Sequence, residues 1–374
     1  MAQTVRDSAG IRIVMNEKPS WSTAQQLKLA ATPSLIIGDK DEEPYQLTRV
    51  RGAFYLSNGK IVVGEAAANE LRVYDANGKY LKKFGRVGDG PGEFRDFARA
   101  VRLAGDTIAV MHGRSSLSRF TGDGKFLHVS SDVSAGSQSG PPEFFKSVAV
   151  PLDGGARLVI SNPTRSVPGA VGARVDAKGP HNLIGADDKV IRSLGELPFM
   201  EGKVGKDHTE KPWLGAEVVF ASNGSEFYYG YPTRYSITRH SARGVPNLIV
   251  RRAWTPIEIT RKDIETFTEE WLKRWSKKGG AETEKDRREL LTDDYAKTLP
   301  AFSAMVLDNT GKLWVRAPKA IDGAVAGSLN NYSIGVSTWS VFGADGRWLG
   351  DVSMPALFEP TDIGADFVLG VLRD

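Results

Sequence analysis

Cationic side chains stand at the ends of several short apolar runs of this sequence. They are Arg49, Arg51, Arg99, Lys146 and Arg316. An arginine guanidinium presents a planar fork of donors that matches a carboxylate or a phosphate, and a lysine ammonium adds a point charge. If the fold brings these side chains together, they form a binding site for an anion. Tyr231 also follows an apolar run and would add a hydrogen-bonding group to that site.

A second set of polar side chains offers ligands for a metal ion. Glu65, His112 and Asn162 each follow an apolar run. Carboxylate, imidazole and amide groups are ligands of calcium or zinc. The five histidines are isolated, without the paired spacing of a metalloprotease helix. The metal site is therefore an alternative to the anion site. We expect no cofactor, and Ca or Zn only in that alternative.

Composition excludes several classes of protein. The 374 residues contain no cysteine, which excludes disulfides, thiolate metal sites and cysteine nucleophiles together. No apolar run is long enough for a transmembrane segment. The formal net charge of +4 is spread over many residues, and the densest basic clusters stand beside acidic residues. We therefore expect no nucleic-acid partner.

A unit of about 45 residues recurs along the chain and would position these side chains. Its clearest copy covers residues 50–94 and holds four apolar runs, at 50–56, 61–64, 71–74 and 80–84. Turn signals such as Asn58-Gly59 and Asn77-Gly78 separate them. Four strands joined by tight turns form an antiparallel meander. This period, with four strands per unit, is typical of a β-propeller blade.

Further copies begin near residues 97, 144, 217 and 302. A sixth copy is split between the ends of the chain. The C-terminus supplies strands at 357–363 and 367–372, and the N-terminus supplies strands at 11–14 and 35–37. We therefore predict an all-β fold, a single six-bladed β-propeller domain over residues 1–374. The N-terminal strands would join the C-terminal blade and so remove both free sheet edges.

Three stretches exceed the repeat, at residues 197–216, 256–300 and 318–332. The links between blades, and those between second and third strands, lie on one face of a propeller. We call this the top face and expect all three stretches there. The cations begin first strands or end second strands, so we expect them around the mouth of the central channel on that face. Long loops on one face of a rigid scaffold are where binding sites form.

The longest of the three stretches, 256–300, is predicted to be a small helical insertion. Thr260 and Asp263 can cap a helix on which Ile264, Phe267, Trp271 and Trp275 follow at helical spacing. A second helix is predicted to carry Leu291, Tyr295 and Leu299 on one side. We expect the aromatic face to pack on the propeller.

The segment VYDANGKYLKKFGRVGDGPGEF resembles the NHL-type repeat. The opening DSAGIRIVMN and the later LPAFSAMVLDNTGKLWVRAP are similar to bacterial six-bladed propellers of the NHL-repeat and TolB-like type. The resemblance implies an exported protein. Gluconolactonase-like and paraoxonase-like relatives hold a divalent cation with Glu, Asn and Asp. By this resemblance, Glu65 and Asn162 lie where such ligands could fall, whereas Arg49, Arg99 and Arg316 would oppose a cation. The peptide-amidating lyase type uses His and Tyr with zinc, which His112 and Tyr231 match loosely.

The sequence therefore favours a ligand-binding propeller over an enzyme. We expect a monomer that is periplasmic or envelope-associated, with a cytoplasmic protein as the alternative. The expected ligand is a protein, a peptide or an anionic small molecule, bound at the top of the channel. The alternative function is a metal-dependent lactonase, esterase or lyase, in which the cation would activate a water.

Overall fold

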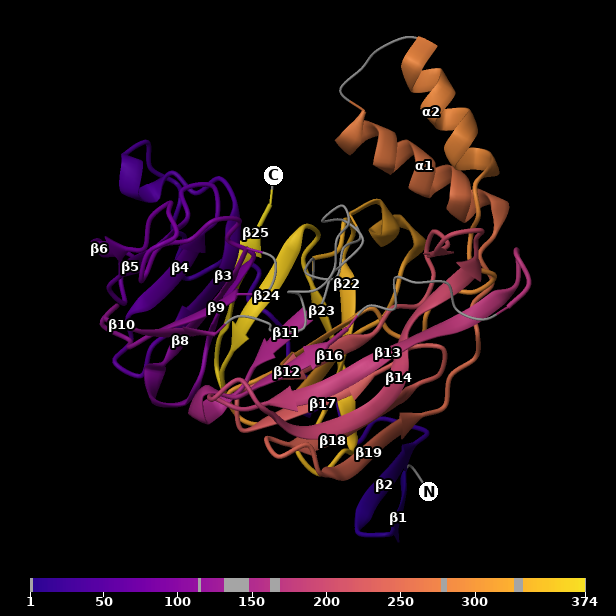
Figure 1. The fold of residues 1–374 in the computed structure, drawn as a ribbon, viewed down its shortest axis with the longest axis horizontal. Helices are drawn as coiled ribbons and strands as arrows, with labels where there is room; N and C mark the ends of the chain where they lie inside the picture. Colours follow the sequence, from indigo (N-terminus) through magenta and orange to yellow (C-terminus); the bar gives the residue numbers. More distant parts are fainter. Residues whose placement is uncertain are drawn as a thin grey trace.

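The computed structural model describes residues 3–113, 116–130, 148–161, 169–276, 281–325 and 332–373. Within these residues the strands form five sheets of four or more strands and one sheet of two strands. The first strands of all six sheets line one central cavity, which is the arrangement of a β-propeller. Figure 1 shows the sheets in chain order, from indigo to yellow. The propeller is confirmed. The prediction of six blades is wrong, because the last sheet stops at two strands and leaves five blades.

The first two blades follow the predicted repeat closely. Blade 1 consists of β3 (Val50–Tyr55), β4 (Ile61–Glu65), β5 (Glu70–Tyr74) and β6 (Tyr80–Phe84). Blade 2 consists of β7 (Arg99–Arg102), β8 (Ile108–His112), β9 (Ser116–Phe120) and β10 (Phe126–Ser130). Strands β4 and β5 are buried throughout, whereas the outermost strand β6 is largely exposed. Middle strands lie between two neighbouring sheets, so nearly every one of their side chains is covered.

Blade 3 departs from the repeat. It consists of β11 (Val148–Pro151), β12 (Arg157–Ile160), β13 (Arg174–Ile184), β14 (Val190–Val204) and β15 (Thr209–Glu210). Strands β13 and β14 pair along most of their length and extend as a ribbon beyond the inner strands (Figure 1). Part of the stretch 197–216, predicted as an insertion, is therefore strand. The remainder includes β15, and residues 211–215 line a central cavity.

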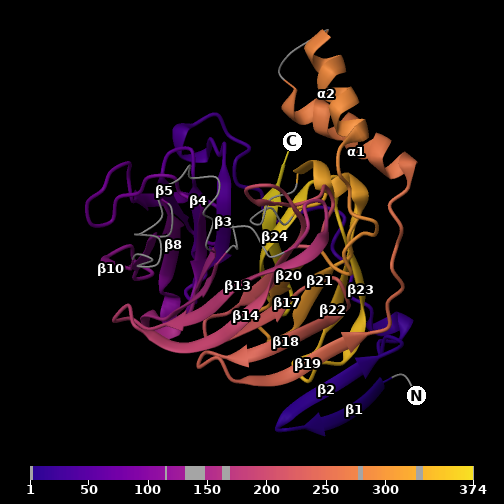
Figure 2. The same ribbon diagram turned by 45° about the vertical axis from the view of Figure 1, so that its right-hand side comes forward.

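Blade 4 includes the two N-terminal strands of the chain. Its strands are β16 (Val219–Ser222), β17 (Glu226–Gly230), β18 (Ser236–Ser241) and β19 (Pro246–Arg252), followed by β2 (Ile11–Asn16) and β1 (Gln3–Ser8). Strand β2 pairs in parallel with β19, as Figure 2 shows at the lower edge. The prediction that strand 11–14 joins the C-terminal blade is therefore wrong. The buried Asn16 directs this pairing, because its side chain donates to Arg251 O and Gly346 O and accepts from Trp348 N.

Blade 5 consists of β20 (Ala304–Leu307), β21 (Leu313–Arg316), β22 (Ser337–Phe342) and β23 (Trp348–Met354). The two-stranded sheet consists of β24 (Phe358–Ile363) and β25 (Val368–Leu372) and lies between blade 5 and blade 1. Residues 35–37, predicted as a strand of this sheet, form no strand. Instead Leu35 and Ile37 pack in the cluster that holds Leu369 and Val371. The N-terminal segment therefore adds side chains to this core cluster and no strand to the two-stranded sheet.

The predicted helical insertion forms two helices, α1 (Arg261–Trp275) and α2 (Ala281–Thr292). The capping box of Thr260 and Asp263 is present. Helix α2 ends before Tyr295 and Leu299, so the predicted second helix was too long. Short 3₁₀ turns also occur in the described residues, at Thr23–Gln25, Glu43–Tyr45, Ala104–Asp106, Asp153–Gly155 and η7 (Ala320–Val325). No helix of the described residues is long and apolar enough to cross a membrane.

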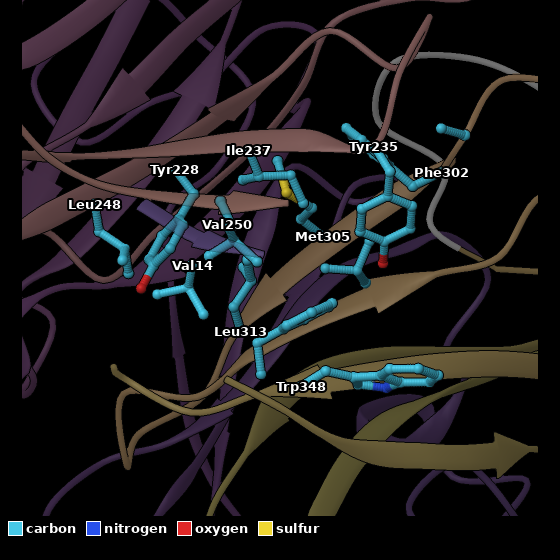
Figure 3. Packing of buried hydrophobic residues seen from close by; sticks show 14 residues of the cluster. Val14, Tyr228, Tyr235, Ile237, Leu248, Val250, Phe302, Met305, Leu313 and Trp348 are labelled. Atoms are coloured by element: carbon cyan, nitrogen blue, oxygen red, sulfur yellow. The ribbon is translucent and has the colours of Figure 1, made fainter. Parts of the chain in front are cut away.

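The core lies between neighbouring blades rather than at one centre. Figure 3 shows the cluster between blades 4 and 5, in which Tyr228, Ile237 and Val250 face Met305 and Leu313. Val14 of β2 is fully buried in the same cluster. Burial of Val14 therefore adds hydrophobic stabilisation to the pairing of β2 with blade 4.

Candidate functional site

Two cavities follow one another along the centre of the propeller. The upper cavity has a volume of about 330 Å³, and its lining residues Trp213 and Leu214 pack with residues of α1 and α2. The lower cavity has a volume of about 450 Å³ and is lined by the later residues of the first strands. Arg99 and Phe220 line both cavities and therefore lie at the junction between them.

All three stretches that exceed the repeat contribute to the upper cavity. Residues 211–215 come from the first and Leu299 and Pro300 from the second. The third contributes Pro318, Lys319, Asp322, Gly323 and Tyr332. A small core holds these stretches together: Phe267 and Leu272 of α1 pack with Leu290, Ala324 and Trp213. Trp213 also donates from Nε1 to Asp293 Oδ2 at 2.8 Å. Rigid packing of this kind keeps the lining in place without a ligand.

The charged lining of the upper cavity is mainly cationic. Its members are Arg99, Lys211, Arg316 and Lys319, with the acids Glu217 and Asp322. Lys211 is paired with Glu217, and Lys319 donates to the carbonyl of Val336. Apolar side chains, which include Trp213, Leu214, Phe220, Leu299 and Phe302, form the remaining walls.

Arg99 is the first residue of β7 and is partly buried. Within the described chain its guanidinium forms no hydrogen bond or ion pair. A guanidinium carries five donors in a fixed fork and retains its charge at any ordinary pH. Arg99 is therefore a cation that lines both cavities with its donors unused by neighbouring residues.

Arg316 ends β21 and is almost completely buried in the wall of the same cavity. Its Nε donates to Ser303 Oγ at 3.0 Å. Burial lowers the pKa of Arg316, and the charges of Asp322 and Glu359 oppose that shift. Arg316 is thus held by the protein, and it contributes positive potential to the cavity.

Asp322 lies on η7 and is 7% exposed. Its Oδ1 accepts from Ser333 Oγ at 2.7 Å and from the backbone N of Ile334 at 3.0 Å. Its Oδ2 is buried and has no hydrogen-bond partner. Burial raises the pKa of Asp322, while Arg316 and the donors on Oδ1 act in the opposite direction.

Arg49 and Arg51 lie at the start of blade 1, and neither belongs to the described lining of the upper cavity. Burial lowers the pKa of Arg51, and the nearby Arg373 and Arg49 lower it further, against Glu359. Tyr332, which lines the upper cavity, is among the groups that act on Arg51. Arg49 is exposed and does not belong to the described lining of the cavity.

Not all residues predicted to bind an anion line the same cavity. Tyr231 is buried, and its hydroxyl donates to Asp176 Oδ1 of blade 3 at 2.7 Å. The hydroxyl proton is therefore already used in a hydrogen bond within the protein. Burial raises the pKa of Tyr231 further from neutrality. Lys146 lies outside the described residues. Of the six predicted residues, Arg99 and Arg316 share the upper cavity.

The predicted metal ligands do not assemble among the described residues. Glu65 is buried, and its carboxylate accepts from the backbone N of Thr48, Arg49 and Ala67. His112 Nε2 lies 2.8 Å from Ser118 Oγ, and burial lowers the pKa of its ring. Asn162 lies outside the described residues. No group of three His, Asp or Glu side chains that could hold a metal occurs in the described chain.

The carboxylates of the lower cavity accept hydrogen bonds from the protein itself, either between neighbouring sheets or within one blade. Asp153 Oδ1 accepts from Ala104 N, and Asp362 Oδ2 accepts from Tyr55 N. Both oxygens of Asp308 are occupied by donors of its own blade. The lower cavity therefore holds structural carboxylates, whereas the charged lining of the upper cavity is mainly cationic, which makes the upper cavity the candidate site.

Sequence reasoning missed Asp322, Phe220, Trp213 and Tyr332 in the site. All except Phe220 lie in the stretches predicted to crowd the top face. Their conformations are set by packing between those stretches, which no local pattern reveals. An acid among small and apolar residues, as in AIDGAV, was the one available signal for Asp322.

Comparison with known proteins finds similar solved structures at low sequence identity. No protein-family model and no curated protein matches the chain. Similar solved structures include a member of the DUF4221 family from Bacteroides vulgatus, with 10% identity, 88% of each chain covered and a TM-score of 0.49. A gluconolactonase from Xanthomonas campestris shows 12% identity over 87% of this chain and 84% of its own, with a TM-score of 0.41.

A third similar structure is a calcium-binding regucalcin from Agrobacterium tumefaciens. It shows 12% identity over 86% of this chain and 79% of its own, with a TM-score of 0.37. Likenesses at this level say nothing about what this chain binds. The propeller fold rests on the sheets of the chain itself.

Proposed function

We propose that this protein is a non-catalytic binding propeller that holds the anionic group of a small molecule or a peptide in its upper cavity. Arg99 carries the proposal. Its partly buried guanidinium faces the cavity without a partner among the described residues. A cation in that position gains a charge-assisted, bidentate interaction when a carboxylate or phosphate enters.

The surroundings of Arg99 support the proposal. Arg316 and Lys319 add positive charge to the wall. The cavity volume of about 330 Å³ lies at the lower end of the range for small-molecule sites. Walls of Trp213, Leu214 and Phe302 would cover an apolar part of the ligand.

The proposal assigns binding without catalysis because the lining lacks an arrangement for nucleophilic attack. The described lining holds no histidine, and its serine, Ser303, accepts a hydrogen bond from Arg316 rather than facing a base. Metal-dependent hydrolysis, the alternative, has no observation in the described residues that favours it.

The proposal is tested by calorimetric titration with 3-phenylpropanoate and phenyl phosphate, alongside the neutral 3-phenylpropanamide. Wild-type protein should bind at least one anion and prefer it to the neutral compound. Arg99→Ala should weaken that binding at least about tenfold, because one charge-assisted contact is lost. Arg49→Ala should have a smaller effect, since Arg49 is exposed.

The matched control is Arg347→Ala. Arg347 is exposed and pairs with Asp345 in its own turn of blade 5. Its removal changes the net charge by the same amount without touching the cavity. If the double variant Arg49→Ala, Arg99→Ala binds every anion as the wild type does, the proposed site is wrong.

A further inference from the structure

The charged lining of the upper cavity has more cations than its own acids can balance. Among the described residues it consists of four cations and two acids: Arg99, Lys211, Arg316, Lys319, Glu217 and Asp322. With every group ionised, four positive and two negative charges leave a net charge of +2. A cavity lined by an excess of one sign favours a ligand whose own charge is opposite and of similar size.

The two acids are already balanced by cations of the same lining. Glu217 Oε2 pairs with Lys211 Nζ. The charges of Arg316 and Lys319 both act on Asp322, so one of these two positive charges remains after Asp322 is balanced. Burial raises the pKa of Asp322, and protonation of its carboxyl group would make the lining more positive still.

Arg99 supplies the second unbalanced charge, at the junction of the two cavities. The lower cavity has the opposite balance. Apart from Arg99, its charged lining among the described residues is Arg102, Asp153, Asp308 and Asp362. Acids outnumber cations there, so an anion is attracted to the upper cavity and not to the lower one.

We propose that the ligand is a dianion, namely a small phosphate monoester of an aromatic or aliphatic alcohol. A phosphate monoester carries about 1.5 to 2 negative charges at neutral pH, and a guanidinium binds phosphate oxygens through two parallel hydrogen bonds. The walls formed by Trp213, Leu214 and Phe302 cover the apolar part of the ester. This inference rests on the proposed anion site and adds to it the charge of the ligand.

The test is a calorimetric comparison of esters that differ in charge but hardly in shape. Phenyl phosphate and 2-phenylethyl phosphate are compared, at about pH 8, with phenyl sulfate and 2-phenylethyl sulfate. The sulfates have the same tetrahedral group with a single negative charge. At least one phosphate should bind at least about tenfold more tightly than its sulfate. Inorganic phosphate, which lacks the apolar part, should bind more weakly than that phosphate ester.

The ionisation of the ligand gives a second comparison. A phosphate monoester has its second pKa at about 6, so most of it carries two charges at about pH 8 and one charge at about pH 5. Its affinity should fall about fivefold relative to the sulfate over that range if the dianion is preferred tenfold. The sulfate keeps its single charge at both pH values, so a change in its affinity reports titration of the protein alone.

Two variants change the charge of the lining in opposite directions. Lys319→Gln removes one positive charge from an exposed side chain. It should reduce the preference for phosphate over sulfate to less than about threefold, while the sulfate still binds. Glu217→Gln removes one negative charge and should strengthen binding of the phosphate more than binding of the sulfate. The control Arg347→Ala removes an exposed charge outside the described lining and should leave the preference unchanged.

The outcomes separate this inference from the anion site. If the sulfates bind the wild type as tightly as the phosphates, or if Lys319→Gln changes the preference no more than Arg347→Ala does, the dianion is wrong and the anion site stands. If none of these compounds binds, or if the neutral 3-phenylpropanamide binds as tightly as the anions, both are wrong. Thermal unfolding shows whether each variant folds, and the wild-type comparison decides the question if one does not.

Discussion

Gly52 of β3 lies directly against the backbone carbonyl of Ala100 in β7. A Cβ atom at Gly52 would stand 2.2 Å from that oxygen, and Gly52 has a φ of +121°. The register of β3 against β4 shifts at the same place, between Val50 and Ala53. Because Ala100 follows Arg99, this close approach of two first strands fixes the backbone that carries the candidate anion ligand.

We therefore expect Gly52→Ala to destabilise the protein by about 2–4 kcal/mol, from steric overlap and backbone strain together. Chemical denaturation measures the change. Gly10→Ala is the matched control, because Gly10 also has a positive φ but has no atom within 4 Å of the added Cβ. The control should lose about 1 kcal/mol, from strain alone. Equal losses in both variants would show that β3 and β7 can move apart around the added methyl group without a loss of stability.

A second prediction concerns Asn16, which ties the N-terminal strand to two blades. Its buried side chain forms three hydrogen bonds with backbone groups of Arg251, Gly346 and Trp348. Asn16→Ala removes all three and leaves buried polar groups without partners, so we expect a loss of about 2–4 kcal/mol in the free energy of unfolding.

The adjacent Glu17 is exposed, and Glu17→Ala should change stability by less than about 0.5 kcal/mol. Hydrogen exchange adds a local measurement. In Asn16→Ala the amides of β2 should exchange faster than those of β18. Uniform exchange in both strands would mean that Asn16 does not hold β2 in particular.

Asn16 also shows how far the sequence could predict this fold. The strands of blade 1 were predicted almost to the residue, because their turns lie within a few residues of each strand. The partner of β2 was missed, because Asn16 selects it through contacts with residues more than 230 positions away. For the site, Arg99 could be predicted from its place at the start of a strand. Asp322 could not, because its position depends on how three insertions pack together.

A third prediction concerns acid sensitivity at His240. Its ring is stacked on Phe227 at 4.8 Å and is mostly buried, and burial lowers its pKa to about 4. The unfolded chain has the ordinary pKa of 6.5. As the pH falls below 6.5 the unfolded state therefore binds a proton before the folded state does. Stability is retained above pH 6.5 and lost between about 6.5 and 4.

The loss from His240 is at most about 3 kcal/mol. His240→Phe keeps the stacking and cannot bind a proton, so its stability should fall less steeply over that range in denaturation at several pH values. His208→Gln, at a more exposed histidine, should keep the wild-type slope. The assignment fails if both variants follow the wild-type profile.

A last prediction concerns the hydrogen bonds that join neighbouring blades. The carboxylate of Asp106 in blade 2 accepts from the backbone N of Ser57 in blade 1, at 3.0 and 3.1 Å for its two oxygens. Asp153 of blade 3 makes the equivalent bond to Ala104 of blade 2, over the same separation of 49 residues. Burial opposes ionisation of Asp106, but its bonds to Ser57 and the charge of Arg102 outweigh it and lower the pKa.

The free energy contributed by Asp106 is thus present above the pKa of the unfolded chain and lost as the pH falls through the lower, folded value. Asp106→Asn should cost about 1–2 kcal/mol near neutral pH, where a charge-assisted bond is replaced by a neutral one. At a pH below both pKa values the difference should shrink, since Asp106 is then protonated. Asp345→Asn is the control, because Asp345 accepts only within its own turn. Asp345→Asn should lower the free energy of unfolding less than Asp106→Asn does. Equal losses would show that the bonds between blades are not the source of the stability that Asp106 adds.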